Sequence, residues 1–323
     1  MHGLAQNQNL NDPEPQSRMS LALPIATLWL LLFSSVLPAQ EAPVAFDAKR
    51  SFEYLKQVCD LGPRVSGTEG MAQQQELIIK HFSQFGCAMS SQAFDVQHPQ
   101  NGTPVRMTNL IVSWQPNAKE RILVCCHYDT RPFPDQDRDK PRGRFIGAND
   151  GASGVALFME LAHHMKTIKP RYGIDFVFFD GEELVYRPSD KYFHGSEYFA
   201  RWISQTPPNY RYVAGVLVDL IGDKSLNLPI EKNSLQMAPK VTKSIWATAK
   251  RLGVKEFIDK PKHEVNDDHI PLNKIARIPT CDIIDFDYFA WHKTTDLPSA
   301  CSGESLEKVG RVLLTWFVDP QLE

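Results

Sequence analysis

The sequence predicts a single α/β domain in which a central, mostly parallel mixed sheet is covered by helices on both faces. Short, continuously apolar segments alternate with longer amphipathic segments from about residue 45 onward. Continuous apolar runs are typical of strands buried on both faces, and the amphipathic segments between them are typical of covering helices. No internal repeat, low-complexity segment or long linker divides this region, so we expect one domain over residues 45–320.

Each element is predicted from a local pattern. Amphipathic stretches predict helices, short apolar runs predict strands, and the Gly-Pro-Arg-Val-Ser-Gly segment at 62–67 predicts a turn between the first two helices. The expected helices are 46–59, 71–85, 152–166, 196–204, 240–252 and 305–317. The expected strands are 109–114, 122–126, 174–179, 213–217 and 281–284.

Residues 1–39 differ from the rest of the chain. A polar start is followed by an almost wholly apolar run from Leu21 to Leu37, and then by Pro38-Ala39-Gln40. This pattern is typical of a secretory signal peptide with a small residue before the cleavage site, and either Met1 or Met19 is the start. We therefore expect an exported protein, periplasmic or secreted. A retained membrane anchor is the alternative, because the run is at the short end of a spanning helix.

Charge and cysteine content disfavour several classes of partner and site. The 323 residues carry a formal net charge of −3 and the basic residues are scattered, so nucleic acid and anionic membranes are not expected as partners. The six cysteines form no Cys-x-x-Cys pair, which disfavours a thiolate zinc site. Cys281 and Cys301 are candidates for a disulfide in an exported chain, although sequence alone leaves the pairing open.

Charged residues stand where the apolar runs stop. The relevant segments are His127-Tyr128-Asp129, Asn149-Asp150, Asp180-Gly181-Glu182-Glu183, Val218-Asp219 and Trp291-His292. Ligands of open α/β sheets gather at the carboxyl ends of the strands, so we expect these side chains to meet at one edge of the sheet. The stretch 131–144, rich in Asp, Arg, Lys and Pro, is expected to form a loop close to them that limits substrate access.

Imidazole and carboxylate groups without thiolates suit zinc or a similar cation. The adjacent Glu182 and Glu183 fit two tasks, because neighbouring side chains of an extended segment point in opposite directions. One carboxylate is expected to hold the metal and the other to transfer protons. Each residue alone has a structural explanation, an Asp as a turn or helix cap and a His as a hydrogen-bonded residue. Five such positions in one α/β chain favour a metal site.

In sequence order, the motifs resemble those of the M28 zinc exopeptidases. They are His127-Tyr128-Asp129, Gly147-Ala148-Asn149-Asp150-Gly151-Ala152-Ser153-Gly154, Phe178-Phe179-Asp180-Gly181-Glu182-Glu183, Gly195-Ser196, Leu217-Val218-Asp219 and Trp291-His292. The resemblance extends from about residue 45 to the C-terminus. It implies the zinc exopeptidase-like fold, a three-layer sandwich.

Within that family the chain is more similar to animal glutaminyl cyclases, the glutaminyl-peptide cyclotransferases, and to their bacterial relatives. Three segments carry this likeness: 217–222 followed by 226–231, the block Asn266-Asp267-Asp268-His269-Ile270-Pro271-Leu272, and the Trp291 that directly precedes His292. In cyclases the indole at this place lines the substrate pocket. We therefore expect Trp291 to bind substrate.

The resemblance also implies a role for each motif residue. Asp150, Glu183 and His292 are expected to bind one zinc ion. Glu182 is expected to act as the general acid and base, with Asp219 and Asp267 sharing a proton network beside it.

A second zinc is the alternative for the metal content. His127 and Asp219 stand at the positions that hold a second ion in two-metal aminopeptidases of this fold. The resemblance therefore implies one zinc ion and keeps two open.

The chain also departs from the animal cyclases. They carry a second pocket tryptophan after the Glu-Glu pair, but here the interval to Gly195 is one residue shorter and Tyr186 or Arg187 falls near that place. We expect Tyr186 to contribute to substrate binding there. The cyclase disulfide near the site has no counterpart, because Cys126 matches one partner and Val155 stands near the place of the other.

The resemblance predicts an aminoacyltransferase that converts the N-terminal glutamine of peptides or proteins to pyroglutamate and releases ammonia. A two-zinc aminopeptidase that hydrolyses N-terminal residues would use the same side chains and is the alternative. A binding protein with an inactive site is disfavoured, because Glu182 and every metal-position residue are present. We expect a monomer with no stable membrane association once the signal peptide is removed.

Overall fold

The centre of the molecule is a six-stranded sheet with the strand order β1-β2-β4-β3-β5-β8. The computed structural model describes residues 45–322, so the predicted signal peptide lies outside the described residues. The strands are β1 (Ala88–Gln97), β2 (Pro104–Trp114), β3 (Glu120–His127), β4 (Gly173–Phe179), β5 (Arg211–Asp219) and β8 (Thr280–Ile284). Strands β4, β3, β5 and β8 pair in parallel, whereas β1 with β2 and β2 with β4 pair antiparallel. The predicted mixed sheet is confirmed.

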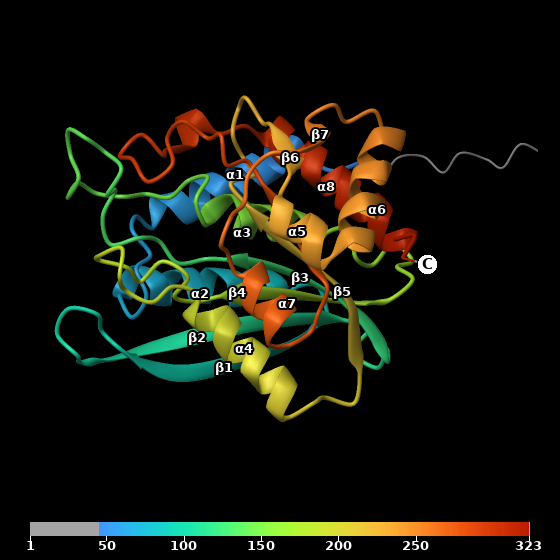
Figure 1. Cartoon of the computed structure of the whole chain (residues 1–323), viewed down its shortest axis with the longest axis horizontal. Coiled ribbons are helices and arrows are strands. Elements are labelled where there is room, and N and C mark those ends of the chain that lie inside the picture. The colour runs from blue at the N-terminus through green and yellow to red at the C-terminus, as the bar shows by residue number, and fades with distance from the viewer. Residues whose placement is uncertain (1–44, 323) are drawn as a thin grey trace, which may run out of the picture. The chain divides into compact units, whose positions relative to one another are not determined.

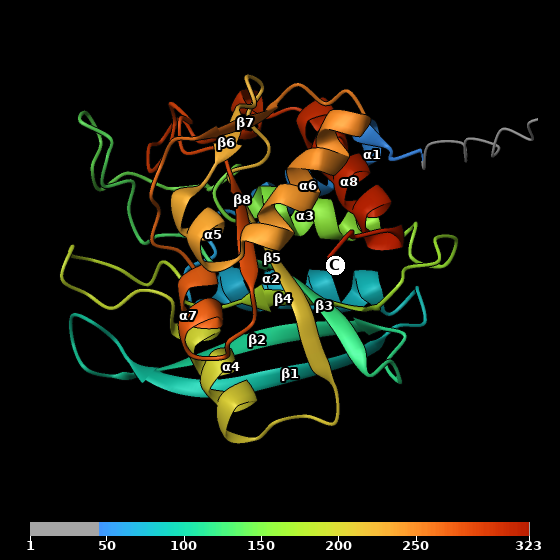
Figure 2. The same ribbon diagram turned by 45° about the vertical axis from the view of Figure 1, so that its right-hand side comes forward.

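Helices cover both faces of the sheet (Figures 1 and 2). They are α1 (Ala48–Asp60), α2 (Glu69–Phe82), α3 (Ala152–Leu161), α4 (His194–Gln205), α5 (Lys232–Met237), α6 (Pro239–Arg251), α7 (His269–Lys274) and α8 (Gly303–Val318). A short parallel pair, β6 (Leu228–Ile230) with β7 (Phe257–Pro261), and a 3₁₀ turn at Pro298–Ala300 complete the described elements. No helix in residues 45–322 is long and apolar enough to cross a bilayer.

Alternating side chains of the central strands pack into two separate cores, because successive residues of a strand point to opposite faces. In β3, Val124 and Cys126 pack into the larger core with α1, α2, α3, α6 and α8, whereas Leu123 and Cys125 pack into the smaller core with α4 and α7. All six cysteines are unpaired thiols, so Cys281 and Cys301 form no disulfide in this structure.

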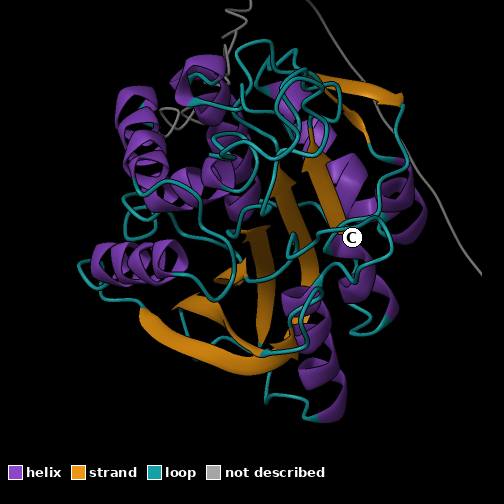
Figure 3. Cartoon of the chain, turned by 90° about the vertical axis from the view of Figure 1, so that its left-hand side faces the viewer, coloured by secondary structure: helices purple, strands orange, loops and turns teal. Residues whose placement is uncertain are grey.

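The parallel strands end at one cluster of loops, where the arrowheads of Figure 3 converge. His127 is the last residue of β3 and Asp219 the last of β5, and Glu182 follows the end of β4 within three residues. The loops that lead into α3 and away from β8 complete this edge. The fold therefore brings the chemically active residues together from segments far apart in the sequence.

Candidate active site

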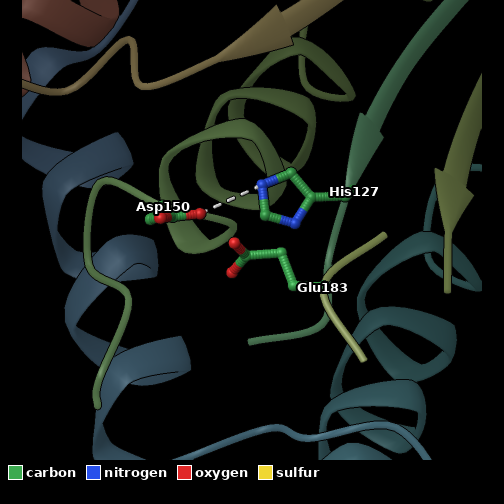
Figure 4. Close-up of side chains that lie close together, drawn as sticks. All are labelled: His127, Asp150 and Glu183. Carbon is green, nitrogen blue, oxygen red and sulfur yellow. Dashed lines mark ion pairs between the residues drawn. The ribbon is translucent and has the colours of Figure 1, made fainter. Parts of the chain in front are cut away.

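Four buried side chains form the centre of this edge: His127, Asp150, Glu183 and His292, each at most 5% exposed. The His292 Nε2 atom lies 2.9 Å from Glu183 Oε1 and 3.5 Å from Asp150 Oδ2. On the other side of Asp150, its Oδ1 lies 3.3 Å from His127 Nε2. The expected set of Asp150, Glu183 and His292 therefore meets. His127 joins it, and Figure 4 shows His127 beside Asp150 and Glu183.

These residues fit a bound cation. Ligand atoms of His127, Asp150 and Glu183 lie within 4.8 Å of one another. The Asp150 Oδ2 atom is buried and accepts no hydrogen bond within the described part of the chain, an expensive arrangement unless a cation compensates it. Burial first, and the Glu183 charge second, raise the pKa of Asp150 to about 6. A set of imidazoles and carboxylates suits zinc.

Asp219 lies next to this centre, with its Oδ1 atom 3.2 Å from His127 Nε2. His127 therefore bridges Asp150 and Asp219, the arrangement expected of the second-metal candidates. This half of the centre contains an imidazole between two carboxylates, so it offers a cation the same kind of ligands as the first half.

Arg131 also belongs to the centre. It begins the loop 131–144 that was expected close to the site, but its contact with Glu183 was not predicted. Its Nη1 atom donates to Glu183 Oε1 at 2.8 Å, and its backbone N–H donates to Glu183 Oε2 at 3.1 Å. Burial alone would raise the pKa of Glu183, but the charges of Arg131 and His292 outweigh it and lower that pKa. Glu183 is therefore held as a carboxylate, the form in which it can bind a metal.

A second layer of carboxylates fixes the backbone that carries the candidate ligands. Asp129 accepts hydrogen bonds from the backbone N–H groups of Glu182 at 3.1 Å and Glu183 at 2.9 Å. Asp296 accepts from the N–H groups of Asn149 at 2.8 Å and Asp150 at 3.2 Å. Sequence reasoning noticed Asp129 only as part of a motif and missed Asp296, which stands four residues after His292.

The turn before α3 presents Asp150 to the centre. Gly151 has φ +90°, and a Cβ atom there would lie 2.8 Å from the carbonyl oxygen of Asp129. The positive φ and the close backbone both favour glycine at this place. His292 also has a positive φ of 53°, which is uncommon outside glycine and typical of functional sites. Asp135 contacts its ring, with Oδ1 3.1 Å from Nδ1.

Glu182 faces a different environment from its neighbour Glu183. It is half-buried, and burial followed by the Glu183 charge raises its pKa well above the ordinary value. Burial and then the Asp219 charge raise the pKa of Asp267 in the same direction. Asp268 donates its backbone N–H to Asp267 Oδ1 at 2.6 Å and continues this acidic group inward. Glu182 and Asp267 therefore tend to keep a proton.

Many of the residues described above line one cavity of about 560 Å³, which we call the active-site pocket. Its volume is in the range of about 300–1,000 Å³ that is typical of small-ligand sites. The lining includes the carboxylates Asp150, Glu182, Glu183, Asp219 and Asp267, the imidazole of His292 and the rings of Tyr192, Phe193, Phe286 and Trp291. The pocket thus combines charged groups with an aromatic wall.

Trp291 and Tyr186, the two predicted substrate-binding residues, have different positions. The Trp291 indole lines the active-site pocket and stacks on His292, with ring centroids 3.8 Å apart and planes inclined by 28°. Tyr186 is not a lining residue of this pocket. Its hydroxyl lies 3.0 Å from His98 Nε2. From the same loop, Tyr192 and Phe193 line the pocket instead.

The chain resembles proteins of known family and structure. The family model described as peptidase family M28 matches residues 109–317. A glutaminyl-peptide cyclotransferase from Bothrops jararaca is 26% identical over 245 residues, which cover 66% of this chain and 65% of that protein. The chain therefore spans slightly less than two thirds of that curated relative.

Solved structures cover the chain more completely. The glutaminyl cyclase of Fimbriiglobus ruber is 43% identical, with a TM-score of 0.83 over 87% of this chain and 97% of that one. A leucine aminopeptidase precursor from Bacteroides thetaiotaomicron is 31% identical, with a TM-score of 0.80 over 86% and 99%. The family model covers well over half of the chain, and the resemblance drawn from the motifs is confirmed. This protein belongs to peptidase family M28.

Proposed function

We propose that the protein is a zinc-dependent glutaminyl-peptide cyclotransferase. It would convert the N-terminal glutamine of a peptide or protein to pyroglutamate and release ammonia. The observation that carries the proposal is the active-site pocket, where Glu182, the candidate zinc ligands and the Trp291 indole line one space. The likeness to the glutaminyl cyclase of Fimbriiglobus ruber, at 43% identity over 97% of that chain, supports it.

Asp150, Glu183 and His292 would hold the zinc ion, whose Lewis acidity would polarise the γ-carbonyl group of the substrate. We infer one ion for this activity. The Arg131 guanidinium and the Asp129 carboxylate would keep Glu183 ionised and in place, as their hydrogen bonds to its side chain and backbone indicate.

Glu182 would move the proton that cyclisation requires. The α-amine of the glutamine attacks its own γ-carbonyl carbon, the new C–N bond closes the ring, and the bond to the amide nitrogen breaks. Glu182 takes a proton from the attacking amine and gives it to the departing nitrogen, which leaves as ammonia. The buried Asp267 would support this role by raising the proton affinity of Glu182, and Asp219, which lines the same pocket, would share its proton network.

Trp291 would hold the reactive conformer of the substrate. Both reacting groups belong to one molecule, so the protein mainly has to keep the side chain folded back on the amine. The indole on His292 provides a flat wall for this purpose. The same wall would exclude water, which otherwise hydrolyses the amide to glutamate.

A two-zinc aminopeptidase is the second candidate. His127 lies between Asp150 and Asp219 at 3.3 and 3.2 Å, so a second ion would find ligands there. Glu182 would then take a proton from the water that attacks the first peptide bond. The likeness to the leucine aminopeptidase precursor of Bacteroides thetaiotaomicron is consistent with this reading.

We further propose that the chain is exported after cleavage near Ala39, acts as a monomer and takes peptide N-termini as its substrates. The apolar run before Ala39 supports export. Nucleic acid is not proposed as a partner, because the chain has no basic run and a net charge of −3.

One assay separates the candidate activities. The zinc-loaded protein is incubated with the dipeptides Gln-Ala and Leu-Ala, and ammonia and free amino acids are measured separately. Ammonia from Gln-Ala without free alanine supports the cyclotransferase. Free leucine from Leu-Ala supports the aminopeptidase, and no product from either dipeptide contradicts both.

A further inference from the structure

A second pocket adjoins the active-site pocket and shares two of its lining residues, Gln136 and Trp291. It has a volume of about 680 Å³ and lies between the loop 137–140 and the turn 288–295. We call it the distal pocket. Trp291 therefore contributes to the walls of both cavities, and the two cavities are neighbours.

The loop that forms one side of the distal pocket is fixed to the turn that forms the other. The Gln136 N–H donates to the carbonyl oxygen of His292 at 3.1 Å, and the Thr294 N–H donates to Asp137 Oδ2 at 2.9 Å. The Thr294 hydroxyl donates to the same oxygen, and this hydrogen bond first, then the backbone one, lowers the pKa of Asp137 to about 2. These hydrogen bonds hold the two sides of the distal pocket together without a ligand.

The distal pocket has an apolar contact surface. Phe289 is 62% exposed, more than any other large hydrophobic side chain in residues 45–322. Exposing a phenylalanine is unfavourable, and an apolar ligand group that covered it would recover part of the lost free energy. With Trp291 beside it, Phe289 offers aromatic area to a side chain.

The distal pocket also has cations without anionic partners. Among the described residues Arg138 and Lys140 form no ion pair, and together with Lys293 they outnumber the two carboxylates of the lining, Asp137 and Asp139. The nearby Asp137 is occupied, because its Oδ1 accepts the backbone N–H groups of Asp139 at 3.0 Å and Lys140 at 2.9 Å. A carboxylate on the ligand would therefore find cations that the protein itself leaves unpaired.

We propose that the distal pocket binds the part of the substrate that follows the N-terminal residue, and favours an apolar side chain beside a carboxylate. This inference rests on the proposed function, since it places the reacting glutamine in the active-site pocket. An extended peptide advances about 3.3–3.6 Å per residue, and we assign its third and fourth residues to the distal pocket, which borders Trp291. The distal pocket then sets which peptide sequences are turned over fastest.

The test compares Gln-Ala-Phe-Glu with Gln-Ala-Ser-Gln, two peptides of equal length. For the wild-type protein, kcat/KM is expected to be about ten-fold higher for the first peptide, carried mainly by KM. The Phe289→Ala variant should lose most of this preference and Lys140→Ala a smaller part. Ile79→Ala is the matched control, because Ile79 is also an exposed apolar residue, at 46%, and lines neither pocket.

A binding measurement separates this inference from the proposed function. The Glu182→Gln variant, loaded with zinc, is titrated with both tetrapeptides by calorimetry, with and without Phe289→Ala. Tighter binding of Gln-Ala-Phe-Glu that depends on Phe289 supports the distal pocket, even if the wild-type protein releases no ammonia from either peptide. That lack of ammonia from the wild-type protein would end the cyclotransferase proposal alone. Equal affinity and equal turnover of the two peptides overturn the distal pocket, whichever reaction the protein catalyses.

Discussion

Glu182 and Glu183 are neighbours in the chain, yet each belongs to a different electrostatic region. On the Glu183 side, carboxylates alternate with cations, because Arg131, His127 and His292 lie within 3.5 Å of the acids. On the Glu182 side, no Lys or Arg among the described residues forms an ion pair with Glu182 or with the acids next to it.

Opposite pKa shifts follow from this difference. Glu183 has a lowered pKa, whereas Glu182 has a raised one. Asp268 belongs with Glu182, and burial raises its pKa to about 7. Two identical functional groups, one residue apart, are thus prepared for two tasks by their surroundings, one to bind a cation and one to carry a proton.

Removing the metal should have the largest effect, because the region around Glu183 then lacks the positive charge at its centre. We expect a chelator to abolish activity and to lower Tm, and zinc to restore both. Saturating zinc at 100 times its Kd adds about 2.7 kcal/mol to the free energy of unfolding. The melting temperature is measured by calorimetry, with magnesium as the control cation, since it prefers oxygen ligands. Full activity of protein shown to be metal-free would contradict the assignment.

Exchanging either glutamate for glutamine tests the division of tasks directly. Glu182→Gln should lower kcat about 10²–10⁴-fold and leave the zinc content unchanged, because only proton transfer is removed. Glu183→Gln should instead lose zinc, because a neutral amide is a poor ligand beside Arg131. Elemental analysis and kcat are measured for both variants. Loss of zinc from Glu182→Gln, or a full zinc content in Glu183→Gln, would contradict this division of tasks.

The variants Asp267→Asn and Asp282→Asn test how far from the pocket the buried acids still affect catalysis. Asp267 lines the active-site pocket, so its variant should lower kcat about ten-fold or more with little change in KM. Asp282 is also buried, and burial raises its pKa, but it does not line the pocket. Its variant should therefore change kcat less than that of Asp267. Equal losses would mean that the acids act as one structural unit.

Asp285 lies outside both regions, and burial is the largest cause of its pKa shift. Burial raises its pKa to about 7, although the N–H groups of Asn227 and Asp287 oppose the shift. The folded protein keeps this proton where the unfolded chain has lost it, so the free energy of unfolding falls as pH rises from about 4 to about 7. The free energy of unfolding of Asp285→Asn, relative to that of the wild type, should therefore increase by about 1–3 kcal/mol from pH 5 to pH 8. Urea unfolding at both pH values measures this, and parallel curves would exclude the shift.

The sequence predicted the buried part of the fold well and the exposed part poorly. The strand expected at 122–126 is observed as Glu120–His127, because a continuous apolar run marks a strand buried on both faces. Strand β1 was missed, since only Phe94 among its residues is buried and an edge strand needs no apolar run. The helix expected at 152–166 ends at Leu161, and turns follow it.

The candidate site likewise has a part that the sequence predicted and a part that it did not. The motif residues converge as expected, because the carboxyl ends of parallel strands must meet. Arg131 and Asp135 were not predicted, since they reach the centre from a loop whose path depends on tertiary contacts. For the same reason the sequence predicts Tyr186 at the pocket wall, whereas Tyr192 and Phe193 of the same loop line the pocket. Spacing along a loop does not determine which of its rings points inward.

The turn around His292 carries a candidate metal ligand, a wall of each pocket and the anchor of the opposing loop. We therefore expect occupancy at one of these places to be coupled to occupancy at the others. If zinc increases the affinity for a long peptide by some factor, the bound peptide must increase the affinity for zinc by the same factor. An organism short of zinc would then retain the ion longest in those molecules that are engaged with substrate.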